Sequence, residues 1–358
     1  MKKNLLILYG GKSAEHEVSL TTATTVINAV DKAKYNIFPV YITKQGTWRS
    51  CGQLRGDACQ LQFDGESEDI AQSLGDILLR YFSTTEKTVV FPVIHGPNGE
   101  DGTLQGLLEL LNVPYVGNGV QASAIGIDKV TTKELFTTAG LPQCDYVAFK
   151  HHEWEADEEA VEVRIEQTIG YPCYVKPAQM GSSVGINWCA DRAALRRAIR
   201  EAFLYDRKIV VEQEVVGREV QVAVIGNDHP ISSIAGEFVK EKAFFDYGTK
   251  YGQGKLFKQI PANITEDTHS AVRELAVKAF QTINGSGLMR VDFFVTDAGD
   301  IFLNEVNTLP GCTAFSMFPV LWEQTNGTTY PQLIDRLIEL ALERHAQKQQ
   351  ICHTRVTV

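Results

Sequence analysis

Residues 287–307, with the sequence GLMRVDFFVTDAGDIFLNEVN, predict a β-hairpin. β-branched and aromatic residues fill its two arms, and the Asp-Ala-Gly-Asp tetrapeptide between them favours a turn. A loop of two or four residues at this turn gives the same register. That register sets Asp292 opposite Glu305 and Arg290 opposite Asn307, with all four side chains on one face. The other face is then mostly apolar and pairs Val291, Phe293 and Val295 with Val306, Asn304 and Phe302.

The polar face of this hairpin has the chemistry of a cation site. Directly opposed side chains have Cβ atoms roughly 4.5–5.5 Å apart, so the carboxylates of Asp292 and Glu305 would repel each other. Two carboxylates and the Asn307 amide oxygen suit a hard cation, and oxygen ligands select Mg²⁺ or Mn²⁺. The alternative is a solvated polar face on an edge hairpin. Repulsion without a counter-ion argues against that alternative.

The composition is that of an ordinary globular protein. Of the 358 residues 44% are hydrophobic, and 44 acidic against 34 basic side chains give a net charge of −10. An acidic chain without a long Lys/Arg run lacks the electrostatic pattern of a nucleic-acid binder. The longest apolar run near the N-terminus, Leu5 to Leu8, is too short for a signal segment or a membrane span. The seven cysteines form no C-x-x-C pair, so we expect neither a disulfide framework nor a zinc site. Together, these observations predict a soluble cytoplasmic protein.

The order of predicted elements divides the chain into units at residues 1–122, 123–216 and 217–358. The first unit alternates strands with helices, including a short strand at 113–117, which predicts an α/β domain with a parallel sheet. Ligands of such sheets bind beyond the carboxyl ends of the strands. Those ends carry Glu15, just past two glycines, and His95. Glu15 can bind a substrate ammonium, or can be ordinary acidic enrichment in the first turn of a helix.

The second unit carries candidate phosphate-binding groups. Lys176 interrupts an apolar strand at 173–177, and the loop GSSVG at 181–185 follows it. Such a loop can donate backbone N–H groups to phosphates, although most Gly/Ser loops are plain turns and this one is not a Walker A motif. Lys176 can be a point charge for a phosphate or a snorkelling edge lysine. Glu212, near the end of a strand expected at 209–216, can bind a nucleotide base or ribose, or can be a charged strand terminus.

The third unit contains an expected loop at 240–258, rich in Gly, Lys and Tyr. A structureless loop of this length is unusual in a compact domain and is often a lid. Tyr247, Lys250 and Tyr251 would then close over a reacting centre. The alternative is an exposed patch of basic and aromatic residues.

Taken together, the motifs resemble the D-alanine–D-alanine ligase family over essentially the whole chain, to about His345. They are YGGKSAEHEVS at 9–19, HGPNGEDG at 95–102, VKP at 175–177, GSSVG at 181–185, MRVD at 289–292 and NEVNTLPG at 304–311. The resemblance implies an ATP-grasp fold, in which two α+β units hold ATP between them, with an N-terminal Rossmann-like α/β domain. It also implies that ATP phosphorylates one D-alanine and that the amine of a second attacks the acyl phosphate.

The resemblance implies a role for individual residues of this sequence. The residues expected to bind ATP are Lys129, Lys176, Ser183, Glu212, Val215, Glu219 and Lys250, with Glu212 at the adenine amino group. The expected catalytic set is Glu15, Ser182, Tyr251, Arg290 and the Gly311 backbone N–H. Glu15, His95, Ser316 and Met317 would contact the two D-alanines, and Asp292, Glu305 and Asn307 would hold two Mg²⁺ or Mn²⁺ ions. A monovalent cation such as K⁺ is a further candidate, and a homodimer is expected by resemblance.

Members of the family differ in the second substrate that they accept. Relatives that make D-alanyl-D-lactate lack the lid tyrosine found here as Tyr251, so the dipeptide-forming reaction is expected. Gln213, Cys312 and Phe315 depart from residues common in the family, at the adenine site and near the second substrate. The competing readings are a D-serine or D-lactate ligase, a ligase of another carboxylate and amine, and a nucleotide-binding protein without catalysis. Intact Arg290 argues against the last reading.

Overall fold

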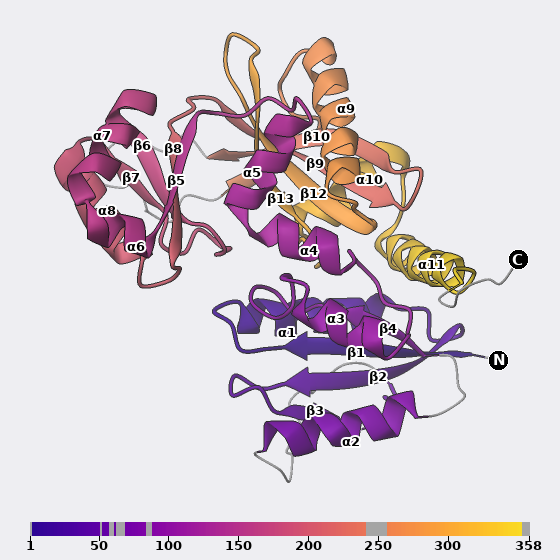
Figure 1. The fold of residues 1–358 in the computed structure, drawn as a ribbon. Helices are drawn as coiled ribbons and strands as arrows, with labels where there is room; N and C mark the ends of the chain where they lie inside the picture. The colour runs from indigo at the N-terminus through magenta and orange to yellow at the C-terminus, as the bar shows by residue number, and fades with distance from the viewer. Residues whose placement is uncertain are drawn as a thin grey trace, which may run out of the picture.

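The computed structural model describes residues 2–50, 52–56, 61, 69–83, 88–240 and 256–352. The chain forms three sheets, each with its own helices (Figure 1). Strands of the first sheet are mainly parallel, and those of the other two are antiparallel. This mixture agrees with the expected α/β and α+β fold class. Within the described residues, none of the helices combines the length and the apolar character needed to cross a membrane.

The N-terminal sheet has the strand order β3-β2-β1-β4. Its strands are β1 (Lys3–Gly10), β2 (Tyr35–Ile42), β3 (Trp48–Ser50) and β4 (Thr88–Pro92), accompanied by α1 (His16–Ala29), α2 (Ile70–Phe82) and α3 (Thr103–Leu110). β1 runs parallel to β2 and β4, as expected, and β3 is an antiparallel edge strand. The strand expected at 113–117 is wrong, because only Tyr115 forms a bridge, to Val90.

The second sheet has the order β5-β8-β6-β7. It is built from β5 (Tyr146–Lys150), β6 (Cys173–Pro177), β7 (Asn187–Cys189) and β8 (Lys208–Gln213), with α6 (His151–Ala156), α7 (Glu158–Thr168) and α8 (Arg192–Ala202) packed on it (Figure 1). The strand expected at 209–216 ends early, at Gln213. Its neighbours do not extend further, since Glu212 pairs with Tyr146 of β5 and Gln213 with Cys173 of β6.

The third sheet has the order β11-β10-β9-β12-β13. Its elements are β9 (Arg218–Gly226), β10 (Ile231–Lys240), β11 (Leu256–Gln259), β12 (Gly287–Val295), β13 (Ile301–Asn307), α9 (Glu266–Thr282), α10 (Met317–Asn326) and α11 (Tyr330–Lys348). The range expected as a loop, 240–258, overlaps described strands at both ends, because β10 includes residue 240 and β11 begins at residue 256. Tyr247, Lys250 and Tyr251 lie outside the described residues.

Two helices connect the first unit to the others. They are α4 (Val120–Ile127) and α5 (Lys129–Thr138), separated by Asp128. The Asp128 side chain accepts hydrogen bonds from the backbone N–H groups of Val130 and Thr131, which caps α5. The boundary proposed after residue 122 therefore falls inside α4.

The hairpin of β12 and β13 confirms the expected register at one end only. Arg290 pairs with Asn307 and Asp292 with Glu305, as expected. Val291 also pairs with Val306, as expected. Beyond them a β-bulge shifts the register by one, so that Phe293 pairs with Leu303 and Val295 with Ile301, and the predicted partners of these two residues, Asn304 and Phe302, are wrong. The turn is a three-residue loop, in which Gly299 has φ 89°. A left-handed glycine in a three-residue loop is a common hairpin solution, and Asn304 is the extra residue of the bulge.

The hydrophobic cores do not correspond one to one with the three sheets. The second sheet has its own core with α7 and α8. The first sheet shares one core with the C-terminal helix: Leu5, Ile7 and Val26 pack in the same cluster as Leu333 and Leu337 of α11. Helix α11 thus covers apolar side chains of the first unit.

Candidate functional site

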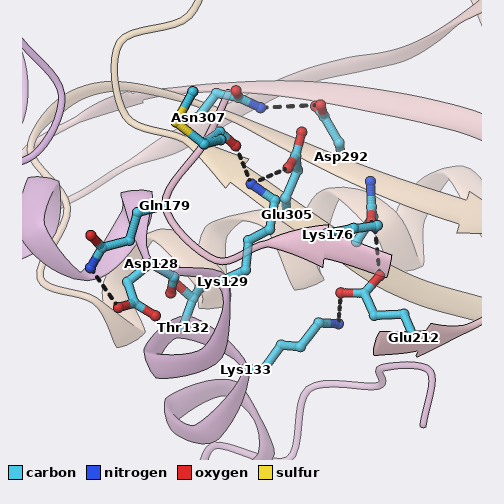
Figure 2. Close-up of polar contacts among 12 residues, drawn as sticks. Asp128, Lys129, Thr132, Lys133, Lys176, Gln179, Glu212, Asp292, Glu305 and Asn307 are labelled. Atoms are coloured by element: carbon cyan, nitrogen blue, oxygen red, sulfur yellow. Dashed lines mark hydrogen bonds and ion pairs between the residues drawn. The ribbon is translucent and has the colours of Figure 1, made fainter. Parts of the chain in front are cut away.

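Lysines from the second unit meet acidic and amide groups of the third sheet (Figure 2). Lys129 Nζ, at the start of α5, lies 3.5 Å from Glu305 Oε2 on β13 and donates a hydrogen bond of 2.8 Å to the Met180 carbonyl. Lys176 Nζ, on β6, donates to Asn304 Oδ1 at 3.3 Å. The bulge makes this last contact possible, because it turns Asn304 away from the apolar face on which it was expected.

Glu212 is buried between two lysines. Lys176 Nζ lies 2.5 Å from Glu212 Oε2, and Lys133 Nζ lies 3.1 Å from Oε1. Glu212 is 2% exposed and Lys133 also 2%. Burial alone would raise the pKa of Glu212, but the two ammonium groups outweigh it and lower the pKa to about 2. The carboxylate is therefore ionised at neutral pH.

Sequence reasoning missed Lys133. Its signal was its spacing of four residues from Lys129, which places both lysines on one face of α5. Lys133 is a charged residue near the middle of a helix, where the bland interpretation is a solvated surface position. The structure instead buries it, with its Nζ over the Tyr146 ring at 5.4 Å from the centroid.

The hairpin end expected to bind a cation is held by hydrogen bonds. Arg290 Nε and Nη2 each donate to the Asp292 carboxylate at 2.7 Å, and Asn307 Nδ2 donates to Asp292 Oδ2 at 3.1 Å. Burial raises the pKa of Asp292 despite Arg290. Burial would also raise the pKa of Glu305, but the field of Lys129 and Lys176 lowers it.

The donor set fits a magnesium ion that is also held by a substrate. In the described part of the chain, no three His, Cys, Asp or Glu side chains converge as a self-sufficient metal centre would need. Asp292 and Glu305 supply carboxylates on directly paired residues, and Asn307 adds an amide. Mg²⁺ typically takes one or two carboxylates and completes its coordination with phosphates and water.

A hydrogen bond joins the first unit to the Gly/Ser loop. Ser182 Oγ donates to Glu15 Oε1, which brings together the two residues expected to act as a pair. Glu15 Oε2 fills the space beside Gly96, where a Cβ would lie 2.9 Å from that oxygen. The carboxyl end of the parallel sheet thus faces the loop, as the topology predicted.

The Gly/Ser loop is a tight turn of left-handed residues. Ser182 has φ 50° and Ser183 φ 57°, and Val184 N donates to the Gly181 carbonyl at 3.1 Å. A left-handed conformation costs a non-glycine residue on the order of 1 kcal/mol. Such strain is commonly stored at functional sites, and here it points Ser182 at Glu15.

His95 is buried beside a carboxylate that sequence reasoning did not select. His95 Nδ1 lies 3.7 Å from Glu100 Oε1, and its Nε2 lies 3.3 Å from Thr22 Oγ1. Gly96 N donates to Glu100 Oε2 at 3.1 Å. Burial raises the pKa of Glu100, with His95 opposing and Glu15 adding to the shift. Glu100 belongs to the HGPNGEDG motif, which was its available signal.

The segment after β13 leads into the N-terminus of helix α10. Ser316 Oγ accepts a hydrogen bond of 3.0 Å from Thr313 N, and a Cβ on Gly311 would lie 3.2 Å from the same oxygen. Ser316 precedes α10 and makes no side-chain cap. The first N–H groups of this helix, beginning with Met317, therefore lack an intrahelical partner and can bind a carboxylate.

The remaining expected residues are less closely tied to these groups. Val215 lies in the connection after β8, and Glu219 lies on β9, paired with Phe294. Lys250 and Tyr251 lie outside the described residues. A cavity of about 600 Å³ lies elsewhere, where α4, α9 and α11 meet, and none of its lining residues is an expected site residue.

Two family models match the chain. "D-ala D-ala ligase N-terminus" matches residues 4–118, and "D-ala D-ala ligase C-terminus" matches residues 135–339. A D-alanine–D-alanine ligase of Geobacillus thermodenitrificans is 52% identical over 362 residues, with 99% of each chain covered.

Solved structures share the fold over nearly the full length. The D-alanine–D-alanine ligase from Coxiella burnetii superposes with a TM-score of 0.80 at 32% identity, covering 98% of this chain and 96% of that one. The VanG D-Ala:D-Ser ligase from Enterococcus faecalis gives a TM-score of 0.79 at 33% identity, covering 95% of this chain and 100% of that one.

Proposed function

This chain belongs to the D-alanine–D-alanine ligase family, and we propose that it joins two D-alanine molecules at the expense of ATP. The product, D-alanyl-D-alanine, serves peptidoglycan precursor synthesis. The observation that carries the proposal is the link between Glu15 and Ser182 across the first unit and the Gly/Ser loop. It sets a substrate-ammonium acceptor beside a loop suited to phosphates.

ATP would bind between the second and third sheets. Lys129 and Lys176 supply positive charge for the phosphates, and both already bridge the sheets through Glu305 and Asn304. The Ser183 backbone and Lys250 would contact the phosphates as well, and Val215 and Glu219 would contact the adenine and ribose. Positioning and charge neutralisation carry most of phosphoryl transfer, so these groups need no nucleophile of their own.

Asp292, Glu305 and Asn307 would hold Mg²⁺ or Mn²⁺ together with the phosphates. When bound, the ions neutralise charge on the transferred phosphoryl group. Without a bound ion, the negative charges of Asp292 and Glu305 are balanced by ion pairs with Arg290 and Lys129, respectively. A requirement for K⁺ is a further proposal.

The first D-alanine would bind with its ammonium at Glu15, close to Ser182 and His95. A carboxylate oxygen of this substrate then forms a bond to the γ-phosphorus of ATP, and the bond between that phosphorus and the β–γ bridging oxygen breaks. The result is D-alanyl phosphate and ADP. Tyr251 would complete the group, since the family resemblance links both Ser182 and Tyr251 to Glu15 by hydrogen bonds.

The second D-alanine would bind with its carboxylate at Ser316 and the Met317 N–H. Its neutral amine attacks the acyl phosphate carbon, a tetrahedral intermediate forms, and the C–O bond to phosphate breaks, which releases phosphate and the proton lost by the nitrogen. Arg290 donates to Asp292 through Nε and Nη2, which leaves its Nη1 donors for the oxyanion. With the Gly311 N–H they form an oxyanion site, where one donor is typically worth about 3–4 kcal/mol.

The experiment is phosphate release by the purified protein with ATP, Mg²⁺ and D-alanine, alone and with D-serine or D-lactate, and identification of products by mass. D-alanyl-D-alanine as the main product in each mixture supports the proposal. A product dominated by D-serine would favour the second candidate, for which the similarity to the VanG D-Ala:D-Ser ligase is the motivating observation. Absence of D-alanine-dependent phosphate release would overturn both.

Selectivity against D-lactate is assigned to the lid. Tyr251→His is expected to raise the fraction of D-alanyl-D-lactate in a mixture of D-alanine and D-lactate, and an unchanged ratio removes Tyr251 from this role. We also propose a cytoplasmic homodimer, since ATP is consumed and the family resemblance places a dimer contact on the first unit. Sedimentation of the purified protein tests the dimer.

A further inference from the structure

Lys133 and Glu212 form a buried pair that the proposed reaction does not yet use. Their atoms Nζ and Oε1 are 3.1 Å apart, and both side chains are almost wholly excluded from solvent. Pairing such groups costs desolvation, and replacement by apolar residues is often neutral or stabilising. The pair is therefore weak as a stability device and invites a different explanation.

The two oxygens of Glu212 are held from different elements. Lys133 reaches Oε1 from α5, and Lys176 reaches Oε2 from the neighbouring strand β6. Lys176 donates a hydrogen bond to Oε2, whereas Oε1 has an ion pair with Lys133 and no hydrogen-bond partner among the described residues. The two ammonium groups together resist rotation of the carboxylate about the last torsion of the side chain. Each oxygen still has a second lone pair, so the group remains able to accept a further hydrogen bond.

The surroundings of Lys133 keep its ammonium in place. Its Nζ lies over the ring of Tyr146 and 3.9 Å from Cys144 Sγ. Tyr146 is the cross-strand partner of Glu212 in the β5–β8 pair. Lys133 thus touches Glu212 and the strand beside it, but it does not reach the hairpin of Asp292 and Glu305 in Figure 2.

We propose that Lys133 is a positioning residue for nucleobase recognition, which orients the ionised Glu212 as a hydrogen-bond acceptor for the exocyclic amino group of an aminopurine. The inference rests on the proposed placement of adenine at Glu212. An ionised carboxylate only accepts hydrogen bonds, so it pairs with an amino group and repels a carbonyl oxygen at the same ring position. Removing Lys133 lets the carboxylate rotate or take up a proton, and either change relaxes the discrimination.

The test compares Lys133→Met with Arg196→Met. Methionine keeps most of the lysine stem and removes its charge. Arg196 on α8 donates to the fully buried Glu162 of α7, at 2.8 Å for one of its contacts, so its replacement also takes a cation from a buried glutamate of the same unit. Neither Arg196 nor Glu162 is part of the proposed site.

Binding is measured by calorimetry with ADP and with inosine diphosphate, which has a carbonyl in place of the amino group. Lys133→Met is expected to lower the affinity for ADP roughly tenfold and the affinity for inosine diphosphate much less, because residues in contact couple strongly. The KM for ATP should rise similarly, while the KM for D-alanine stays within about twofold. Arg196→Met should leave the ratio of the two affinities unchanged.

A second comparison uses the Glu212→Gln background. If Lys133 acts through Glu212, adding Lys133→Met to Glu212→Gln changes ADP affinity by less than about twofold. An equal loss in both backgrounds, or an equal loss for ADP and inosine diphosphate, would overturn the proposal. The proposed reaction can fail separately from this inference. If the wild-type protein releases no phosphate with D-alanine but binds ADP more tightly than inosine diphosphate, the proposed reaction is wrong and the role of Lys133 is still supported.

Discussion

Ser182 donates a hydrogen bond to Glu15, although the two residues are 167 positions apart in the chain. One lies at the start of α1 in the first unit, and the other lies in a strained turn of the second. The contact closes the site across two units that have separate sheets. The coupling between them is therefore measurable by a double-mutant cycle.

Ser182→Ala and Glu15→Gln are each expected to raise the KM for D-alanine and to lower kcat/KM. Because the side chains touch, the double variant should lose less than the sum of the two single losses, with a coupling of roughly 1–2 kcal/mol. Steady-state kinetics of the four proteins give this coupling. Strictly additive losses would show that the bond has no part in turnover.

Asp292→Asn is expected to lower kcat by at least about a hundredfold, because the cation and Arg290 both lose a charged partner. The fold should persist, since an amide of the same shape remains. Asp297→Asn makes the same chemical change in the exposed turn of the same hairpin and should leave kcat unchanged. Circular dichroism and kcat of the two variants decide; equal activity of both would remove Asp292 from the metal set.

Gly126→Ala and Gly106→Ala are expected to have opposite effects on stability. A Cβ on Gly126 in α4 would lie 2.4 Å from the Thr308 Cγ2 atom, and Thr308 is buried directly after Asn307. Overpacking of this kind costs roughly 1–3 kcal/mol and would also shift Asn307. A Cβ on Gly106 in α3 meets nothing within 4 Å and gains about 0.5–1 kcal/mol of helix stability.

Thermal unfolding midpoints and kcat measured together test this pair. Gly126→Ala should lower both quantities, while Gly106→Ala should raise the midpoint and keep kcat. If Gly126→Ala unfolds at the wild-type temperature, the packing of α4 on β13 is looser than the geometry indicates.

Low pH is expected to reduce the folding stability of the protein through protonation of Glu212. Its pKa in the folded state is about 2, against an ordinary value of 4.5. A lowered folded pKa contributes stability above the unfolded pKa, and this contribution is lost as the pH falls from about 4.5 towards 2. The shift corresponds to roughly 3 kcal/mol, of which about 2 should be lost by pH 3.

Glu212→Gln lacks this titration and serves as the comparison. Its urea midpoint should be lower than that of wild type at pH 6, because two buried lysines lose their partner. Between pH 6 and pH 3 the midpoint should fall less in the variant than in wild type. Parallel decreases would mean that Glu212 is not held ionised in the folded state.

The sequence was sufficient for the pairing of Asp292 with Glu305, because alternation along the hairpin fixes which residues share a face. It was not sufficient for the bulge at Asn304. The Leu303 N–H on the same strand donates to the Pro142 carbonyl, and Asn304 contacts Lys176. Both partners come from the second unit, so the pattern of this strand alone gave no sign of them.

Local patterns also located the loop of Ser182 and the lysine of β6, since each interrupts its surroundings in a way that a short window reveals. Lys133 was missed for a physical reason: a lysine on a helix is usually solvated, and only the tertiary position of Glu212 makes it buried. Glu214, two residues after Glu212 and just beyond β8, accepts a hydrogen bond from Trp188 Nε1 at 3.1 Å and, within the described part of the chain, does not contact the lysines that hold Glu212.

The packing of α11 against β1 and α1 has a consequence for synthesis of the chain. β1 is translated long before α11, the helix that covers its apolar side chains. Domains generally fold in order as they emerge. This one must hold an uncovered apolar face until α11 has been translated, so the nascent chain is exposed to aggregation around β1, and a product truncated before α11 cannot complete its first domain.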